Sequence, residues 1–205
     1  MLTRRHILLS SAMLAIGSMV PSAVFAQAAD PGASAFIQKL GDETVATFAN
    51  KGLSREQAVE KFRTLLYAGF DVPYIGRWVL GRYWNQASPA EQTEYQKLFE
   101  RLIVDTYANR FVDYSGQTFK ITGTRPEGDA DTSVTTQILR QDGPPIGVDW
   151  RVRKGGSGYK IIDVAVEGVS MGLTQRQEFA SVIQGGGGRV DALLQALRQK
   201  VGSRT

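Results

Sequence analysis

The chain has 205 residues, of which 42% are hydrophobic and 21% charged, and its formal net charge is +4. This mixture is too apolar for a disordered chain and too polar for a protein with several membrane spans. The chain contains no cysteine, which excludes disulfides, zinc-thiolate sites, iron-sulfur clusters and cysteine nucleophiles.

The first 26 residues predict a secretory signal peptide. Arg4 and Arg5 precede a mostly apolar run over residues 7–20, and small residues lead up to a cleavage position after Ala26. The run is shorter than the roughly 20 residues that a helix needs to span a bilayer. We therefore expect cleavage and a single mature domain over residues 27–205. The arginine pair also resembles a twin-arginine signal, so the general and the twin-arginine export routes both stay open.

Loss of this segment changes the chemistry that the mature chain can perform. The only histidine, His6, is removed with it, as are two of the 24 Lys and Arg residues, which leaves 22 against 20 Asp and Glu. Histidine catalysis and histidine metal ligands are thereby excluded. No basic cluster dense enough to follow a phosphate backbone is present either. We expect no metal, no cofactor and no nucleic-acid partner, and we favour a non-enzymatic function.

Helical patterns occupy the first half of the mature chain. After a small, polar leader over residues 27–32, apolar spacing close to 3.6 predicts a helix from Ser34 to Asn50. Capping boxes at Ser54 and Ser88 mark two further helix starts, the second opening a helix of some 25 residues. A short helix is expected between them, from Asp71 to near residue 81.

From Phe119 onward the apolar period changes to 2. Four strands joined by short turns are expected around residues 119–121, 133–138, 148–153 and 159–167, which is typical of an antiparallel meander. Thr174 is expected to cap a helix, and a glycine run over residues 185–188 precedes a last amphipathic helix. Helices, then strands, then helices predict the α+β class.

Aromatic, glycine and arginine residues recur along the segment from Asp71 to Trp84. Further motif positions follow at Thr106, Tyr107, Tyr114, residues 163–170, Arg176 and Phe179. In this order they resemble the MlaC family of periplasmic phospholipid-binding proteins, also called the toluene-tolerance auxiliary component. The resemblance covers nearly all of the mature chain and departs from the family at the glycine run. The hopanoid-biosynthesis-associated HpnM group is a closely similar branch, so both branches stay open.

The resemblance implies a fold and a role. The expected fold is a cystatin-like half-cone, in which a curved four-stranded antiparallel sheet packs against helices and encloses a deep apolar pocket. The expected role is that of a soluble, monomeric carrier of phospholipid across the periplasm. Its implied partners are an outer-membrane lipoprotein-porin complex and an inner-membrane ABC transporter with MCE domains.

A carrier of this kind must bury acyl chains almost completely. Two chains expose on the order of 30 methylenes, and at about 0.8 kcal/mol each the cost in water approaches 25 kcal/mol. We expect the pocket between the apolar face of the sheet and the long helix. The candidate lining residues are Val79, Leu98, Leu102, Ile103, Val134, Ile138, Val148, Trp150, Val152, Val164, Val166 and Val169.

Polar residues allow further interpretations. Arg151 and Arg153 are expected on a solvated outer face of the sheet, with a position near a lipid headgroup as the alternative. Arg77 is expected to pair with Asp163, which interrupts an apolar strand. A carboxylate-dependent enzyme using Asp149 and Asp163 is the second functional hypothesis, and a pure interaction module with a solid core is the third.

Overall fold

The structure is a computed structural model that describes residues 30–49, 52–112, 117–140 and 143–202. The predicted signal peptide and Tyr114 lie outside these residues. Within them the chain forms six α-helices, one 3-10 helix and five strands, so the predicted α+β class is confirmed. In this part of the chain, no helix combines the length and the apolar character needed to cross a membrane.

The first helix begins earlier than its apolar spacing predicts. Helix α1 spans Pro31–Phe48, and the side chain of Asp30 accepts a hydrogen bond from the Gly32 N–H at 2.8 Å. Proline suits the first helical position because its φ is already helical and it has no N–H to leave unpaired. The expected leader over residues 27–32 is therefore wrong at its last two residues, which are helical.

Both predicted capping boxes are present. Helix α2 spans Arg55–Gly69, and Ser54 and Gln57 exchange side-chain and backbone hydrogen bonds at its start. Helix α4 spans Pro89–Val112. At its start the Ser88 N–H donates to Glu91 Oε2 at 2.8 Å, and the Glu91 N–H donates to Ser88 Oγ at 3.3 Å. These local contacts satisfy backbone groups that a helix end leaves free.

A short helical segment separates α2 from α4. Helix α3 spans Val72–Leu80 and is capped, as predicted, by Asp71, which accepts from the Tyr74 N–H at 3.1 Å. The 3-10 helix η1, Gly81–Asn85, follows at once and was not predicted. Gly81 has φ +60°, a backbone conformation that favours glycine, and it ends α3.

The sheet is an antiparallel meander in the order β1-β2-β3-β4-β5. Its first four strands are predicted, whereas the two-residue β5 is not. A turn with positive φ at Glu167 and Gly168 folds β5 back onto β4, and glutamate rarely adopts that conformation, so the sequence carries no clear signal for it. The strands are β1 (Thr118–Glu127), β2 (Asp131–Leu139), β3 (Ile146–Gly155), β4 (Gly158–Val166) and β5 (Val169–Ser170).

Two register shifts interrupt the meander. One lies between Ile121 and Gly123 in β1, and the other lies between Arg151 and Val152 in β3, where β4 contributes one extra residue. Because of the second shift, Val152 lies opposite Ile161. Ile161, rather than Ile162 as the alternation predicted, therefore lies in the row of Val152.

Helix α5, Met171–Gly185, begins at a different residue from the one predicted. Ser170 is the cap, and its Oγ accepts from the Leu173 N–H at 3.0 Å. The predicted cap, Thr174, is wrong because it lies inside the first turn, where its hydroxyl donates to the Ser170 carbonyl oxygen at 2.9 Å. The expected glycine break follows, and helix α6 spans Val190–Gly202.

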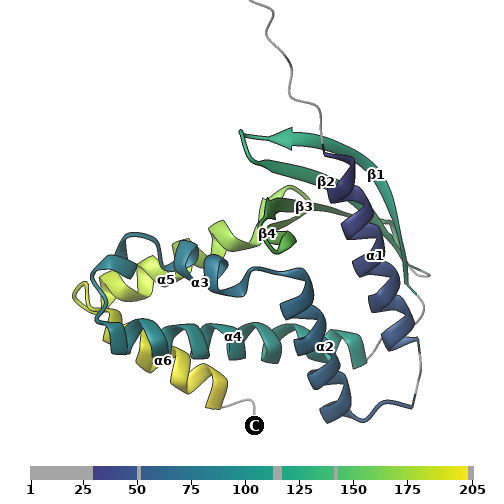
Figure 1. The fold of residues 1–205 in the computed structure, drawn as a ribbon. Helices are drawn as coiled ribbons and strands as arrows, with labels where there is room; N and C mark the ends of the chain where they lie inside the picture. The colour runs from purple at the N-terminus through teal and green to yellow at the C-terminus, as the bar shows by residue number, and fades with distance from the viewer. Residues whose placement is uncertain (1–29, 50–51, 113–116, 141–142, 203–205) are drawn as a thin grey trace, which may run out of the picture.

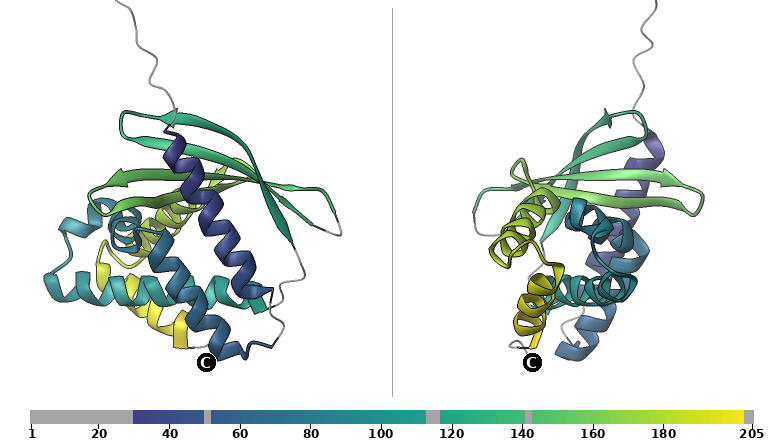
Figure 2. Two further views of the ribbon diagram at one scale, coloured as in Figure 1. Left: turned by 45° about the vertical axis from the view of Figure 1, so that its right-hand side comes forward. Right: turned by 90° about the vertical axis from the view of Figure 1, so that its left-hand side faces the viewer.

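The elements form a sheet region and a helical region. Figure 1 shows α4 and α6 on the side away from the sheet, and Figure 2 shows α1 crossing the strands. Buried apolar side chains form two groups. The helical cluster includes Val79, Tyr95, Phe99, Leu102, Phe179 and Leu194. The sheet cluster consists of Ala33 and Ile37 of α1 with Val134, Val152 and Ile161.

Phe70, between α2 and α3, joins the two regions. Its half-buried ring packs against both clusters. Phe70 also forms a parallel bridge with Ile161, and the neighbouring Asp71 N–H donates to the Ile161 carbonyl oxygen at 3.0 Å. The start of α3 is thus attached to β4 by the backbone.

Candidate functional site

One face of the sheet is mainly apolar across all five strands, and we call it the apolar face. Directly paired residues of neighbouring strands project to the same side of a sheet, so the register defines its rows. The central row consists of Ile121, Thr136, Val148, Val166 and Val169. The adjacent row consists of Thr124, Val134, Trp150 and Val164.

Exposure changes along the central row. Thr136 and Val148 are 1% and 4% exposed, Val166 is half-buried, and Val169 is 58% exposed. Within the described residues, Val148 and Val166 belong to neither apolar cluster. The apolar face therefore extends beyond the sheet cluster and reaches solvent at its β5 end.

Trp150 supplies the largest side chain of the apolar face. Its ring is half-buried, packs against the sheet cluster and lies edge-on to Phe70, with ring centroids 6.5 Å apart. The indole N–H donates to Thr136 Oγ1 at 2.9 Å, and the Thr136 hydroxyl donates to the Val148 carbonyl oxygen at 3.2 Å. Since the polar atoms of both side chains are paired within the sheet, the apolar ring surface needs no polar partner.

The candidate lining residues fall into two sets. Seven of the eight strand residues are buried or half-buried on the apolar face, namely Val134, Ile138, Val148, Trp150, Val152, Val164 and Val166. Val169 differs from the expected enclosed position because β5 is only two residues long and lies at the edge of the sheet.

The four candidates on helices lie in the helical cluster or pack against it. Val79 and Leu102 are buried within the helical cluster, and Leu98 and Ile103 are half-buried and pack against it. The structure thus brings the helical candidates together and the strand candidates together, without joining them in one cluster. Helix α4 packs mainly on α2, α3 and α6.

The opposite face of the sheet is polar and is organised around Asp131. This carboxylate is only 2% exposed, and it accepts two hydrogen bonds from Arg153, at 2.6 and 3.0 Å, and one from Arg151 at 2.8 Å. Burial raises the pKa of Asp131, but the bonds from the two arginines outweigh it and hold the pKa below its usual value. Arg153 also lies over the Tyr74 ring, 4.9 Å from its centroid.

Arg151 and Arg153 are therefore on the polar face as predicted, but they are not freely solvated. Each is held by Asp131, a residue that sequence reasoning did not single out. The register places Asp131 directly opposite Arg153, so only the pairing of β2 with β3 reveals the contact.

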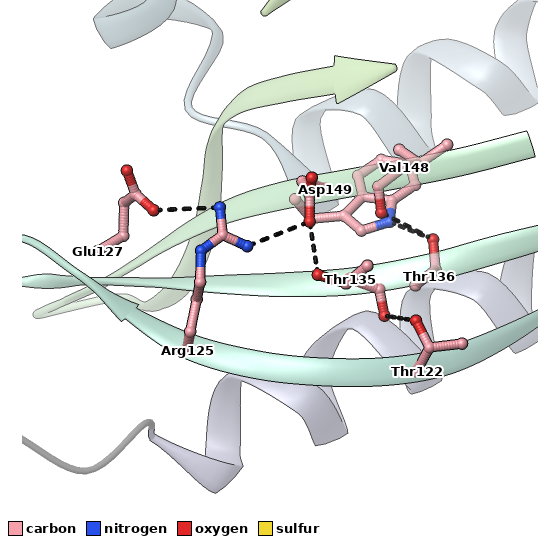
Figure 3. A network of polar contacts seen from close by, with 8 residues as sticks. Thr122, Arg125, Glu127, Thr135, Thr136, Val148 and Asp149 are labelled. Atoms are coloured by element: carbon pink, nitrogen blue, oxygen red, sulfur yellow. Dashed lines mark hydrogen bonds and ion pairs between the residues drawn. The ribbon is translucent and has the colours of Figure 1, made fainter. Parts of the chain in front are cut away.

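A second polar network on the same face surrounds Asp149 (Figure 3). Asp149 accepts from the Thr135 hydroxyl and, at 3.4 Å, from Arg125, which also pairs with Glu127. Its carboxylate is thus shared between neighbouring strands of the sheet. This arrangement ties β1, β2 and β3 together.

The predicted pair between Arg77 and Asp163 is wrong. Asp163 instead accepts from the Ser170 hydroxyl at 2.6 Å and from the Gly172 N–H at 3.1 Å. The Arg77 guanidinium lies over the Trp84 ring, 5.7 Å from its centroid. Asp163 therefore anchors the start of α5, which explains a carboxylate within an otherwise apolar strand.

Sequence reasoning also missed Phe70 and Ile121. Phe70 follows the last residue of α2 and gives no periodic signal, although a large aromatic residue just before a helix cap often packs against neighbouring elements. Ile121 alternates correctly with Phe119 but precedes the register shift in β1. In the part of the chain that the structure describes, no cluster of three or more acidic or histidine side chains could hold a metal ion.

Comparisons with known proteins agree on one family. A family model described as "MlaC protein" matches residues 38–199. A solved structure of a phospholipid-binding protein from Ralstonia solanacearum, in complex with a phospholipid, superposes with a TM-score of 0.73 at 28% sequence identity. That match covers 83% of this chain and 97% of the other.

Two curated relatives match over shorter stretches. A toluene tolerance protein of Pseudomonas putida is 24% identical over 110 residues, or 54% of this chain and 51% of the relative. The intermembrane phospholipid transport system binding protein MlaC of Haemophilus influenzae is 27% identical over 133 residues, or 63% of this chain and 61% of the relative. The matched part of the chain thus spans between half and two thirds of these relatives.

Proposed function

Because the chain belongs to the MlaC family, we propose that it is a carrier that binds the acyl chains of phospholipids and moves them between membranes. The observation that carries the proposal is the similarity to a solved relative that holds a phospholipid, a similarity that extends over 83% of this chain.

The physical requirement on such a carrier is an apolar surface that side chains do not cover. Each methylene moved into water costs about 0.8 kcal/mol, so even a single acyl chain must be almost fully enclosed. A carrier needs no catalytic group. The apolar face supports this function, since its Trp150 and Val166 are only half-buried and its Val169 is 58% exposed.

We place the acyl-chain site between the apolar face of the sheet and the helical cluster. On the sheet side the half-buried Trp150 and Val166 offer apolar surface, and on α4 the half-buried Leu98 and Ile103 are the candidates. Val169, at the exposed end of the central row, is a natural position for the mouth of the site. The polar headgroup would remain at that mouth, in contact with water.

The proposal includes a location and partners. Residues 1–26 act as a cleaved signal peptide, and residues 27–205 form one domain that works as a monomer in the periplasm. The partners are an outer-membrane lipoprotein-porin complex and an inner-membrane ABC transporter with MCE domains. The name of the Haemophilus influenzae relative, which refers to intermembrane phospholipid transport, supports this assignment.

Two alternatives remain as outcomes of the test. A hopanoid-related lipid would use the same apolar surface, so only the identity of the bound lipid separates it from a phospholipid. A carboxylate-dependent enzyme is less favoured, because Asp149 and Asp163 each accept hydrogen bonds from neighbouring groups that fix the sheet and the start of α5.

The test is to identify the lipid that purifies with the protein. The protein is purified from its own cell envelope without detergent, extracted with organic solvent and analysed by mass spectrometry. Near-stoichiometric phospholipid is expected, and the emptied protein should take up labelled phospholipid from vesicles. A hopanoid in the extract would favour the second lipid class. No copurified lipid together with no uptake from vesicles would contradict the carrier function.

A further inference from the structure

A small concave site lies between α3, η1 and α5, and none of the residues that line it is among those named for the acyl-chain site. Its volume is about 250 Å³. Its lining combines two arginines with three aromatic rings, one amide and one glycine, namely Arg77, Arg176, Tyr74, Trp78, Trp84, Asn85 and Gly81. We call it the arginine site.

The two guanidinium groups of this site have no carboxylate partner. Several other arginines in the described residues pair with acidic side chains, as Arg153 does with Asp131 and Arg198 with Glu94. Arg77 and Arg176 form no ion pair within the described part of the chain. Arginine stays charged at any physiological pH, so both positive charges are available to a ligand.

Tryptophan rings hold both guanidinium groups in place. The Cζ of Arg77 lies 5.7 Å from the centroid of the Trp84 ring, and the Cζ of Arg176 lies 5.5 Å from that of Trp78. A cation over an aromatic ring is attracted to the ring through its face. The N–H groups along the edge of each guanidinium remain able to donate hydrogen bonds.

Gly81 makes room for Arg176. A Cβ at this position would lie 3.0 Å from three atoms of the Arg176 guanidinium, and the φ of +60° is itself unfavourable for other residues. The backbone at the end of α3 thus allows the guanidinium to lie directly against it. The position of Arg176 depends on this glycine and on the stacked ring of Trp78.

We propose that the arginine site binds a phosphate group. Guanidinium groups bind phosphate through paired N–H···O bonds, and two of them match its charge and its several acceptor oxygens. The Asn85 side chain adds an amide donor to the lining. The phosphate belongs either to a soluble phosphate ester or to a lipid headgroup at a membrane surface, and the experiment separates these sources.

The experiment measures tryptophan fluorescence of the complete mature protein, because Trp78 and Trp84 line the site. One arm titrates inorganic phosphate and glycerol 3-phosphate at constant ionic strength, with chloride as the reference anion. The other arm measures sedimentation with vesicles of phosphatidylglycerol and of phosphatidylcholine. Saturable phosphate binding without vesicle binding assigns a soluble ester, and binding to phosphatidylglycerol vesicles alone assigns a headgroup.

The variants are Arg77→Gln, Arg176→Gln and, as a matched control, Arg189→Gln. Arg189 is exposed in the turn between α5 and α6, and its substitution removes the same charge as the other two. Each of the first two variants is expected to weaken binding about tenfold or more, as for the loss of a charge-assisted hydrogen bond. The control should bind like the unmodified protein, and Arg176→Lys should be intermediate because it keeps the charge without the paired donors.

Two results would overturn the proposal. One is no binding by the unmodified protein in either arm, and the other is equal weakening in all three Arg→Gln variants. Circular dichroism and urea unfolding verify that each variant is folded. The proposal does not depend on the carrier function, because the same variants are expected to retain copurified lipid.

Discussion

At the scale of single residues, Asp131 is the buried charge on which the polar face of the sheet depends. Its side chain is 2% exposed, whereas those of its partners Arg151 and Arg153 are 42% and 37% exposed. Removing the carboxylate leaves two guanidinium groups that can still reach water. The free energy of unfolding should therefore fall by less than it does when one partner of a fully buried ion pair is removed.

We expect Asp131→Asn to lower the free energy of unfolding by about 1–3 kcal/mol, measured by urea denaturation at neutral pH. Asp42→Asn, an exposed change of the same kind on α1, should change it by less than about 0.5 kcal/mol. Equal effects of the two substitutions would show that the Asp131 cluster contributes no stability.

The same residue predicts a pH dependence. The folded protein holds the pKa of Asp131 below the ordinary value of 3.8, so the stabilisation is present above that value and is lost as the pH falls through the folded pKa. The difference in unfolding free energy between the unmodified protein and Asp131→Asn should be constant above about pH 5 and shrink below about pH 4. A difference as large at pH 2 as at neutral pH would contradict this linkage.

At the scale of elements, the start of α5 depends on Ser170. Its Oγ accepts from the Leu173 N–H at 3.0 Å and its hydroxyl donates to Asp163 at 2.6 Å, so one side chain both caps α5 and attaches it to β4. The hydroxyl of Thr174, one turn later, donates to the Ser170 carbonyl oxygen and caps no backbone N–H among the described residues.

Ser170→Ala is therefore expected to reduce the free energy of unfolding by about 1–2 kcal/mol, the usual cost of a lost N-cap. Thr174→Ala should change the free energy of unfolding by less than about 0.5 kcal/mol, because alanine is the better helix former at an interior position. The measurement is the free energy of unfolding of both variants, obtained by urea denaturation. A larger loss for Thr174→Ala would mean that α5 begins where the sequence pattern alone places it.

The elements that could be predicted are those with local signals. Capping boxes at Ser54 and Ser88 and the alternation along β3 depend on neighbouring residues, and these elements are present as predicted. Thr174 with Gln177 also has the form of a capping box, so the same rule misplaces the start of α5. The true cap, Ser170, is recognised only through Asp163 and the short strand before it, and those contacts are tertiary.

At the scale of the whole molecule, the proposed site depends on the apolar surface between the two clusters. Val166→Trp adds a large side chain at a half-buried position of the central row. Because the added ring would occupy space that the acyl chains need, we expect uptake of labelled phospholipid to fall by roughly fivefold or more.

Gln137→Trp is the matched control for this experiment. Gln137 is exposed in β2 and lies next to Ile138, so its side chain projects to the polar face. The Gln137→Trp variant should take up as much labelled phospholipid as the unmodified protein. Unchanged uptake by Val166→Trp, with both variants folded, would place the acyl chains elsewhere.

The sequence could predict which side of each strand is apolar, but it could not predict what covers that side. Val152 and Val166 follow the same alternation, yet Val152 packs into the sheet cluster beneath α1 whereas Val166 belongs to neither cluster. Likewise Leu102 and Ile103 are adjacent on α4, and only Leu102 is fully buried. Such differences arise from how α1 and α4 are placed relative to the sheet, which no local pattern encodes.

The two borders of the sheet have a consequence for how copies of the chain behave together. β1 forms one border and contains Pro126 and the register shift after Ile121, and the other border is shielded by Phe70 at Ile161 and by β5. An irregular border with a missing N–H is a poor template for another strand. The proposed carrier would expose apolar surface whenever it takes up or releases a lipid. The irregular borders of its sheet would then disfavour strand pairing between copies of the chain and so disfavour fibre formation.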